Sequence, residues 1–227
     1  THVAGIVLGM TQNILSPNLD PAVIQIMPLK FLDENGVGST SDALEAINYA
    51  LDNGANVLNN SWGGGYYSQA LHDVITTGYN RGVSFIAAAG NSANNNDSSP
   101  VYPASYEVPN VVSIAATSSH DSLASFSNFG NETVHVASPG ISILSTLPND
   151  SFGYSSGTSM AAPFAAGLAA LMIREKGAIN GYQVKGVLYD HSDAIGGLNG
   201  YVASRSRINA LEAVDFVQKN NIDSYQP

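Results

Sequence analysis

A short polar turn leads directly into the longest apolar helix that the sequence predicts. The turn and the start of the helix read Gly-Thr-Ser-Met-Ala-Ala-Pro over residues 157–163, and the apolar run continues to residue 173. Ser159 would then lie at a helix N-terminus, where free N–H groups and the positive end of the helix dipole favour negative charge. A serine in that setting suits nucleophilic attack on a carbonyl carbon. The structural alternative is that Thr158 or Ser159 caps the helix, with Pro163 in its first turn.

Five stretches together resemble the subtilisin-like serine proteases, or subtilases. The seven residues around Ser159 are similar to the active-serine motif of that family. Four further stretches follow in the family's order: Thr-His-Val-Ala-Gly at 1–5, Asn-Ser-Trp-Gly-Gly at 60–64, Ala-Ala-Ala-Gly-Asn-Ser at 87–92 and Tyr-Pro-Ala at 102–104. The likeness runs from residue 1 to about residue 211. It implies a serine endopeptidase that forms an acyl-enzyme on Ser159.

Asn91 is the second residue to which the resemblance gives a catalytic role. It follows a predicted buried strand and Gly90, so its amide would stand at the carboxyl edge of a sheet. The family likeness implies that this amide and the Ser159 N–H bind the substrate oxyanion together. In subtilisin, loss of this donor lowers turnover by about 10² to 10³. The structural alternative is an asparagine that stabilises its own turn.

The resemblance also implies a substrate cleft with two edges. The residues that would line it are Ser61, Trp62, Gly63, Ala88, Ala89 and Gly90. A polypeptide substrate would pair with the glycine-rich edge as an added strand, and we expect apolar residues before the scissile bond because nothing charged matches the pocket walls. A phosphate-binding glycine loop is the competing interpretation, but the sequence has neither a G-x-G-x-x-G spacing nor a following lysine. A nucleotide-binding domain is therefore disfavoured.

Two members of the family's catalytic triad have no match. In the family the catalytic histidine opens the motif His-Gly-Thr-His-Val-Ala-Gly, and the aspartate lies on a strand upstream; His2 matches only the second histidine. The other histidines, which we expect to be non-catalytic, are His72, His120, His135 and His191. We expect the base and the aspartate to come from a missing N-terminal segment or fragment of the same protease; a propeptide is a further candidate partner. The alternative is a non-catalytic subtilase-like module that binds peptides or proteins.

Composition fits one domain that acts outside the cell. The 227 residues suffice for a single core, and we treat residues 1–227 as one N-terminally incomplete catalytic domain. The net charge of −10 disfavours nucleic acid as a partner. No apolar run reaches the length of about 18 residues that a membrane span needs. The resemblance implies a secreted or cell-surface protein.

Strands alternate with helices along the chain, which predicts an α/β fold with a doubly wound, mostly parallel sheet. Strands are expected at 23–32, 57–59, 83–89, 111–116 and 141–146, and helices at 1–10, 39–51, 68–81, 159–173, 182–189 and 210–218. Thr40 or Ser41 is the expected cap of the helix at 39–51. The family's aspartate-bearing strand would be missing from the middle of this sheet, so we expect the chain alone to be inactive and not to hold its native fold.

No cofactor is expected for catalysis, and no metal ligand is assigned. Structural calcium is left open, because the family often carries a calcium-binding loop where residues 11–20 lie, although the match there is poor. His135 stands where the family often has an acidic residue near a weak cation site, which argues against that site. Phe164 stands where the family usually has a histidine.

Overall fold

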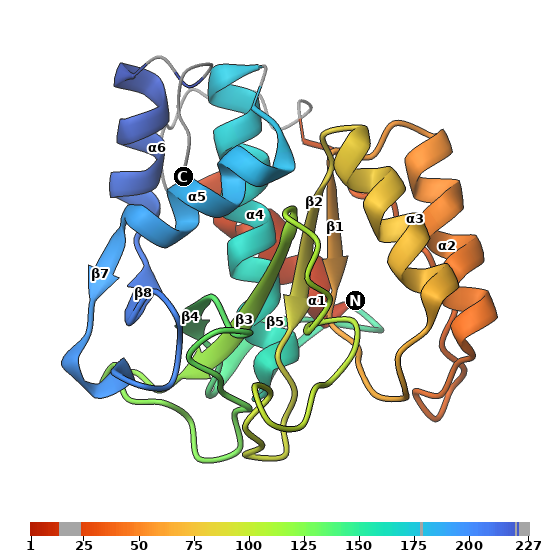
Figure 1. Ribbon diagram of the computed structural model, residues 1–227, viewed down its shortest axis with the longest axis horizontal. Helices are drawn as coiled ribbons and strands as arrows, with labels where there is room; N and C mark the ends of the chain where they lie inside the picture. Colours follow the sequence, from red (N-terminus) through yellow and green to blue (C-terminus); the bar gives the residue numbers. More distant parts are fainter. Residues whose placement is uncertain (14–23, 178, 221, 223–227) are drawn as a thin grey trace.

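A six-stranded sheet forms the centre of the molecule (Figure 1). The computed structural model describes residues 1–13, 24–177, 179–220 and 222. The strand order is β1-β2-β3-β4-β8-β7, in which all neighbours are parallel except the antiparallel pair β7 and β8. The strands are β1 (Val57–Asn60), β2 (Ser84–Ala88), β3 (Val111–Thr117), β4 (Val136–Pro139), β7 (Ser192–Ala194) and β8 (Ser206–Ile208). The predicted α/β class is confirmed.

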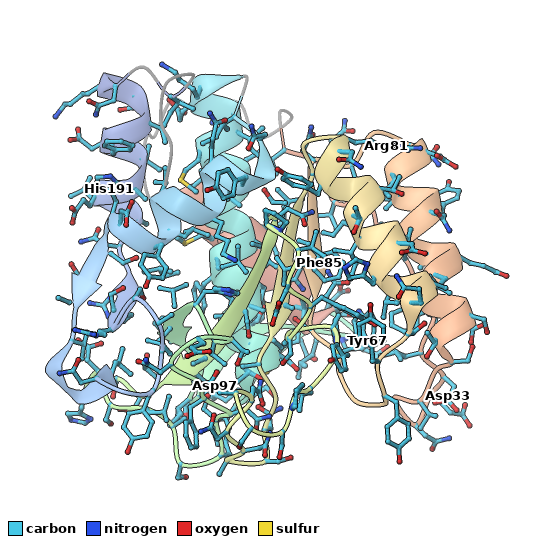
Figure 2. The ribbon with its side chains drawn as sticks, in the orientation of Figure 1. Asp33, Tyr67, Arg81, Phe85, Asp97 and His191 are labelled. Carbon is cyan, nitrogen blue, oxygen red and sulfur yellow. The ribbon has the colours of Figure 1, made fainter. Side chains whose placement is uncertain are left out.

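Helices cover both faces of this sheet. They are α1 (His2–Asn13), α2 (Thr40–Asp52), α3 (Gln69–Asn80), α4 (Thr158–Lys176), α5 (Gly181–Asp190) and α6 (Ala210–Lys219). Strand β2 is buried along its whole length, and its side chains alternate between the two layers. Phe85 packs in the cluster with α2 and α3, where Figure 2 labels it, whereas Ile86 packs in the cluster with α4, α5 and α6.

Capping residues fix where the helices begin. Ser39, rather than the expected Thr40 or Ser41, caps α2, because its hydroxyl accepts from the N–H of Asp42 while the Asp42 carboxylate accepts from the N–H of Ser39. Ser68 caps α3 in a simpler way, through the N–H of Leu71. Both helices bury one apolar face, as the helical spacing of apolar residues in the sequence predicted.

The predicted strand at 23–32 is wrong for the described residues. Residue 23 lies outside them, and residues 24–32 form no strand. Pro28 has no N–H to donate, and Ile24 and Ile26 pack against the core instead of pairing. As a result β1 is one edge of the described sheet. We expected the missing aspartate-bearing strand to leave a gap in the middle of the sheet, but the described strands are continuous from β1 to β7.

A β-hairpin carries the chain from the sheet to α4. Its strands, β5 (Ile143–Leu147) and β6 (Ser151–Ser155), pair antiparallel and make a separate two-stranded sheet. The hairpin contacts the start of α1: the Ser145 hydroxyl donates to the carbonyl of His2 over 2.7 Å, and His2 Nε2 lies 3.1 Å from the carbonyl of Gly153. The hairpin therefore joins α1 to the segment that precedes Ser159.

Candidate active site

The carboxyl ends of β1 and β2 and the N-terminus of α4 meet at one end of the sheet. In Figure 1 both strands point toward the lower edge of the view, where α4 begins. Ser61 directly follows β1, Gly90 and Asn91 lie just after β2, and Ser159 is the second residue of α4. Open α/β sheets bind ligands at this end. The fold thus brings together the residues that the sequence predicted at separate positions.

The turn before Ser159 depends on glycine. Gly157 is the N-cap of α4 with φ 156° and ψ 162°, and as a glycine it has no side chain to cap the helix. The alternative that Thr158 or Ser159 serves as the cap is therefore wrong. That backbone conformation is one that residues with a Cβ rarely adopt. The first N–H groups of a helix have no partner four residues earlier, and here the Met160 N–H bonds to the Gly157 carbonyl over 3.0 Å.

Pro163 is the sixth residue of α4, so the expectation that it lies in the first turn is also wrong. An N–H at this position would bond to the carbonyl of the residue four positions earlier, which is Ser159. Proline has no N–H. The carbonyl of Ser159 therefore lacks its usual partner within the helix.

Ser159 is held by reciprocal hydrogen bonds to Ser61. The Ser159 hydroxyl donates to the main-chain carbonyl of Ser61 over 3.2 Å. In return, the Ser61 hydroxyl donates to the main-chain carbonyl of Ser159 over 2.9 Å. Both residues are half-buried. The segment after β1 is thereby tied to the start of α4.

The Asn91 side chain is oriented by Thr158. Its Oδ1 accepts from the Thr158 N–H over 2.8 Å and from the Thr158 hydroxyl over 3.0 Å. The same hydroxyl accepts from the N–H of Gly90 over 3.1 Å. These contacts occupy the oxygen of the amide and fix which way it faces, so Nδ2 is the atom left to donate.

Two donors border one small space beside Ser159. A Cβ placed on Gly157 would lie 3.4 Å from Asn91 Nδ2, 3.6 Å from Asn91 Oδ1, which is already bonded to Thr158, and 3.7 Å from the main-chain nitrogen of Ser159. Because residue 157 is glycine, that space stays open. Two N–H donors close to one open space beside a serine residue are the components that an oxyanion site for acyl transfer needs.

The residues predicted to line the cleft differ in exposure. Gly63 is exposed, and Trp62 is half-buried, with its indole N–H bonded to Asn60 Oδ1 over 3.1 Å and its ring edge-on to Phe31. Gly90 is half-buried, whereas Ala88 and Ala89 are 4% and 0% exposed and belong to the core. Side chains of these two alanines thus offer no surface to a peptide, so their predicted role would have to come from the main chain.

None of the histidines bonds to Ser159 among the described residues. His72 lies on α3 beside Asp73, His120 is in an exposed turn, and His191 stacks on Phe216 and pairs with Glu212. His2 contacts the hairpin through Nε2, and its Nδ1 is buried without a partner in the described chain.

His135 is built into the sheet and not into the site. Its Nδ1 accepts the N–H of Ser113 over 2.9 Å, one residue before β4. Burial, with a smaller effect of the nearby Lys185 ammonium, lowers the pKa of His135 to about 3. Burial lowers the pKa of Lys185 to about 8. The ring is therefore neutral near pH 7, as its role as an acceptor requires.

Sequence and structure comparisons identify the family. Residues 1–215 match the subtilase family, peptidase S8. The chain belongs to the subtilase family. It is 39% identical over 221 residues to a thermophilic serine proteinase from Bacillus sp. (strain AK1), covering 95% of this chain and 52% of that protein. It is 35% identical over 217 residues to thermitase from Thermoactinomyces vulgaris, covering 95% of this chain and 74% of that protein.

Solved structures agree with the subtilase fold. A cold-adapted subtilisin-like serine proteinase superposes with a TM-score of 0.75 at 32% identity, covering 92% of this chain and 71% of that chain. The chain spans about half the length of the first of the relatives above. The family resemblance and the subtilisin-like fold expected from the motifs are thus confirmed.

Acidic and histidine side chains do not cluster in the described residues of this subtilase. The part of the chain that the structure describes contains no group of three or more His, Cys, Asp or Glu residues that could hold a metal ion. Residues 14–23, which include most of the loop at 11–20, lie outside the description. No described helix is long and apolar enough to cross a bilayer.

Sequence reasoning missed how the site is held together. It placed Ser61 in the cleft but did not predict that its hydroxyl bonds to Ser159, nor that Thr158 orients Asn91. One signal was available: a proline four residues after Ser159 implies a carbonyl that needs a partner outside the helix.

Proposed function

We propose that this subtilase is a serine endopeptidase that hydrolyses peptide bonds through an acyl-enzyme on Ser159. The observation that carries the proposal is the pair of donors, Asn91 Nδ2 and the Ser159 N–H, whose nitrogens both lie within 3.7 Å of the Cβ position on Gly157. These donors would bind the oxyanion of the tetrahedral intermediate. The subtilase relatives, which are named as proteinases, support the same reaction.

The reaction needs a base that the described residues do not place beside Ser159. In the first step the Ser159 oxygen would bond to the carbonyl carbon while its proton passes to an imidazole. Collapse of the oxyanion would break the C–N bond, and the same proton would leave with the amine. Water would then hydrolyse the ester and restore the serine. We propose that the imidazole, and the aspartate that orients it, come from an upstream segment of the same protease.

The free edge of β1 supports a site for that segment. In the described sheet β1 pairs on one side only, with β2. Asn59, on this strand, has a buried Oδ1 with no partner among the described residues. An additional strand along β1 would supply donors to this edge and would stand next to Ser61 and hence Ser159. We propose this position for the upstream segment and expect the 227-residue chain to be inactive without it.

We further propose a polypeptide substrate bound along the exposed glycines after Ser61. Gly63, Gly64 and Gly65 are all exposed, although the N–H of Gly64 already donates to the carbonyl of Tyr102 over 3.0 Å. The half-buried Trp62 ring makes this edge apolar, which favours apolar residues before the scissile bond. A secreted or cell-surface location and structural calcium are further parts of the proposal.

Peptide cleavage by the full-length protein tests the proposal. A library of peptides should be cut with a preference for apolar residues before the scissile bond, and Ser159→Ala should abolish cleavage. Ser156→Ala is the matched control, since Ser156 is exposed three residues earlier and its hydroxyl contacts the N–H of Ser142. Cleavage that survives Ser159→Ala would refute the assignment. A strong preference for Arg or Lys would refute the substrate class.

A non-catalytic peptide-binding module is the second candidate, because no histidine of the described chain contacts Ser159. It predicts a folded full-length protein that binds peptides at the same glycine edge but cleaves none. Equal peptide affinity of the wild type and Ser159→Ala, measured calorimetrically without any turnover, would favour this candidate over the protease.

A further inference from the structure

Pro163 leaves the nucleophile residue with a free main-chain acceptor. The Ser159 carbonyl would otherwise accept from the N–H of residue 163, and that N–H does not exist. The Ser61 hydroxyl donates to this carbonyl instead, over 2.9 Å. A contact from another element thus replaces a helical hydrogen bond at the residue that carries the reactive oxygen.

Asn59 determines which way the Ser61 hydroxyl points. Asn59 Nδ2 donates to Ser61 Oγ over 2.9 Å. A hydroxyl has one hydrogen and two lone pairs. With Asn59 donating to the oxygen, the hydroxyl hydrogen is directed to the Ser159 carbonyl. The result is a chain of hydrogen bonds from strand β1 to the first turn of α4.

We propose that Ser61, oriented by Asn59, is a positioning residue for the nucleophile. The Ser159 hydroxyl must leave the Ser61 carbonyl when it transfers its proton, but the bond from the Ser61 hydroxyl to the Ser159 carbonyl can persist throughout the reaction. That bond fixes the main chain of Ser159, and with it both the attacking oxygen and the N–H that faces the oxyanion. This inference rests on the proposed protease function.

The role predicts a loss in turnover and not in substrate binding. In the full-length protein, Ser61→Ala should lower kcat about tenfold, because small displacements of reacting groups cost 10- to 100-fold in rate, and KM should change less than about twofold. Ser61→Thr keeps the hydroxyl and should restore most of the rate. Ser192→Ala is the matched control, since the Ser192 hydroxyl donates to the Leu188 carbonyl over 2.7 Å far from the site.

Asn59 should act only through Ser61. Asn59→Ala should lower kcat by less than Ser61→Ala does, and it should add nothing in the Ser61→Ala background, because residues that act in series are not additive. A full additional loss in the double variant would overturn the proposed chain. So would an unchanged kcat in Ser61→Ala, or an equal loss in Ser192→Ala.

Hydrogen exchange tests the same bond without relying on activity. Ser61→Ala should speed amide exchange in residues 158–162 at the start of α4, Ser61→Thr should return it to the wild-type rate, and Ser192→Ala should leave it unchanged. Unchanged exchange in Ser61→Ala would overturn the positioning role. A wild-type protein that cleaves no peptide, yet shows the expected exchange pattern, would instead refute the protease function and leave the structural clamp standing.

Discussion

Two asparagines at the same end of the sheet use the same side chain in opposite ways. Asn128 is 1% exposed and fully bonded: its Oδ1 accepts from the N–H groups of Ser92 and Asn94 at 2.8 and 3.1 Å, and its Nδ2 donates to Asn96 Oδ1 over 3.0 Å. Asn91 is exposed, and its contacts occupy Oδ1 alone. The Asn128 amide thus stabilises a loop, whereas the Asn91 amide keeps a donor for a ligand.

The loop that Asn128 stabilises supports the loop that carries Asn91. Asn96 Nδ2 donates to the carbonyl of Ala89 over 2.9 Å, and Gly90 packs so closely on the Asn128 amide that a Cβ there would clash with it. Both contacts are made within two residues of Asn91. The loop after β2 is therefore a rigid base from which Asn91 projects, which is what a preorganised donor requires.

Asn91→Asp should have the largest effect, and it should fall on activity. Aspartate keeps the oxygen that accepts from Thr158 but replaces the NH₂ donor with a negative charge beside the oxyanion. Turnover should fall by at least about 10² to 10³, the value known for removal of one such donor, with the midpoint of thermal unfolding changed by no more than a few degrees. Steady-state kinetics and thermal melts of the full-length protein check this. A large loss of stability with normal turnover would reverse the two roles that we assign.

His135 is also a side-chain acceptor, for the Ser113 N–H, but unlike the two asparagines it can be protonated. Its folded pKa of about 3 lies below the ordinary value of 6.5, so the unfolded state binds the proton more tightly. Stability should therefore be fully present above pH 6.5 and decline as the pH falls toward 3. At about 1.4 kcal/mol per unit of pKa shift, the loss reaches several kcal/mol.

The His135→Asn variant isolates this effect. An asparagine oxygen can accept the Ser113 N–H without titrating, so the free energy of unfolding should depend less on pH between 6.5 and 4 than in the wild type. Urea titrations over that range measure it. Identical pH dependence in the two proteins would show that acid acts through other groups.

Asn128→Ala should destabilise the protein by about 2 to 3 kcal/mol. It removes the acceptor of the part-buried N–H groups of Ser92 and Asn94 and the buried donor to Asn96, and polar groups left without partners cost about 1 to 3 kcal/mol each when buried. Chemical denaturation checks the stability. Turnover of the folded fraction should fall much less than in Asn91→Asp; a loss of turnover without any loss of stability would contradict the division between the two amides.

Asp97→Asn should have the smallest effect. Figure 2 shows Asp97 among the loops at the lower edge. Partial burial raises its pKa, but bonds from Thr133, Glu132 and Asn131 together outweigh this and lower the pKa below its ordinary value. The Asp97 contribution is present above the unfolded pKa of 3.8 and is lost as pH falls through the folded value.

The cost of Asp97→Asn should be about 1 kcal/mol, because the group is solvent-exposed and its interactions are screened. Unfolding titrations at pH 7 measure it. A change in kcat would contradict the purely structural role, since within the described chain the Asp97 carboxylate accepts hydrogen bonds only from residues 131–133.

Local patterns predicted well the elements that are buried on repeating faces. The apolar run at 83–89 became β2, and the helical spacing at 39–51 became α2, because burial of those side chains decides both structures. The run at 23–32 has alternating apolar residues but failed as a strand in its described part, since a strand also needs a neighbour and no pattern within the segment supplies one. The predicted strand at 141–146 was half of a hairpin, whose second strand is largely exposed and weakly patterned.

The site was predicted as a set of residues and not as a geometry. Motif resemblance placed Ser159 and Asn91, and the fold brings them together. The bonds that orient them, from Thr158 and Ser61, depend on the distance between segments about 67 and 98 residues apart in the chain. Sequence spacing carries no information about such contacts, apart from the proline that frees the Ser159 carbonyl.

The most direct test of the account is the intact mass of the full-length protein and of the 227-residue chain, each before and after exposure to a fluorophosphonate. An activated serine reacts quickly, and a serine without a base does not. We predict one adduct on the full-length protein, mapped to the peptide that contains Ser159 and absent in Ser159→Ala, with no adduct on the 227-residue chain. A folded full-length protein that stays unlabelled would contradict the central claim that Ser159 is a catalytic nucleophile.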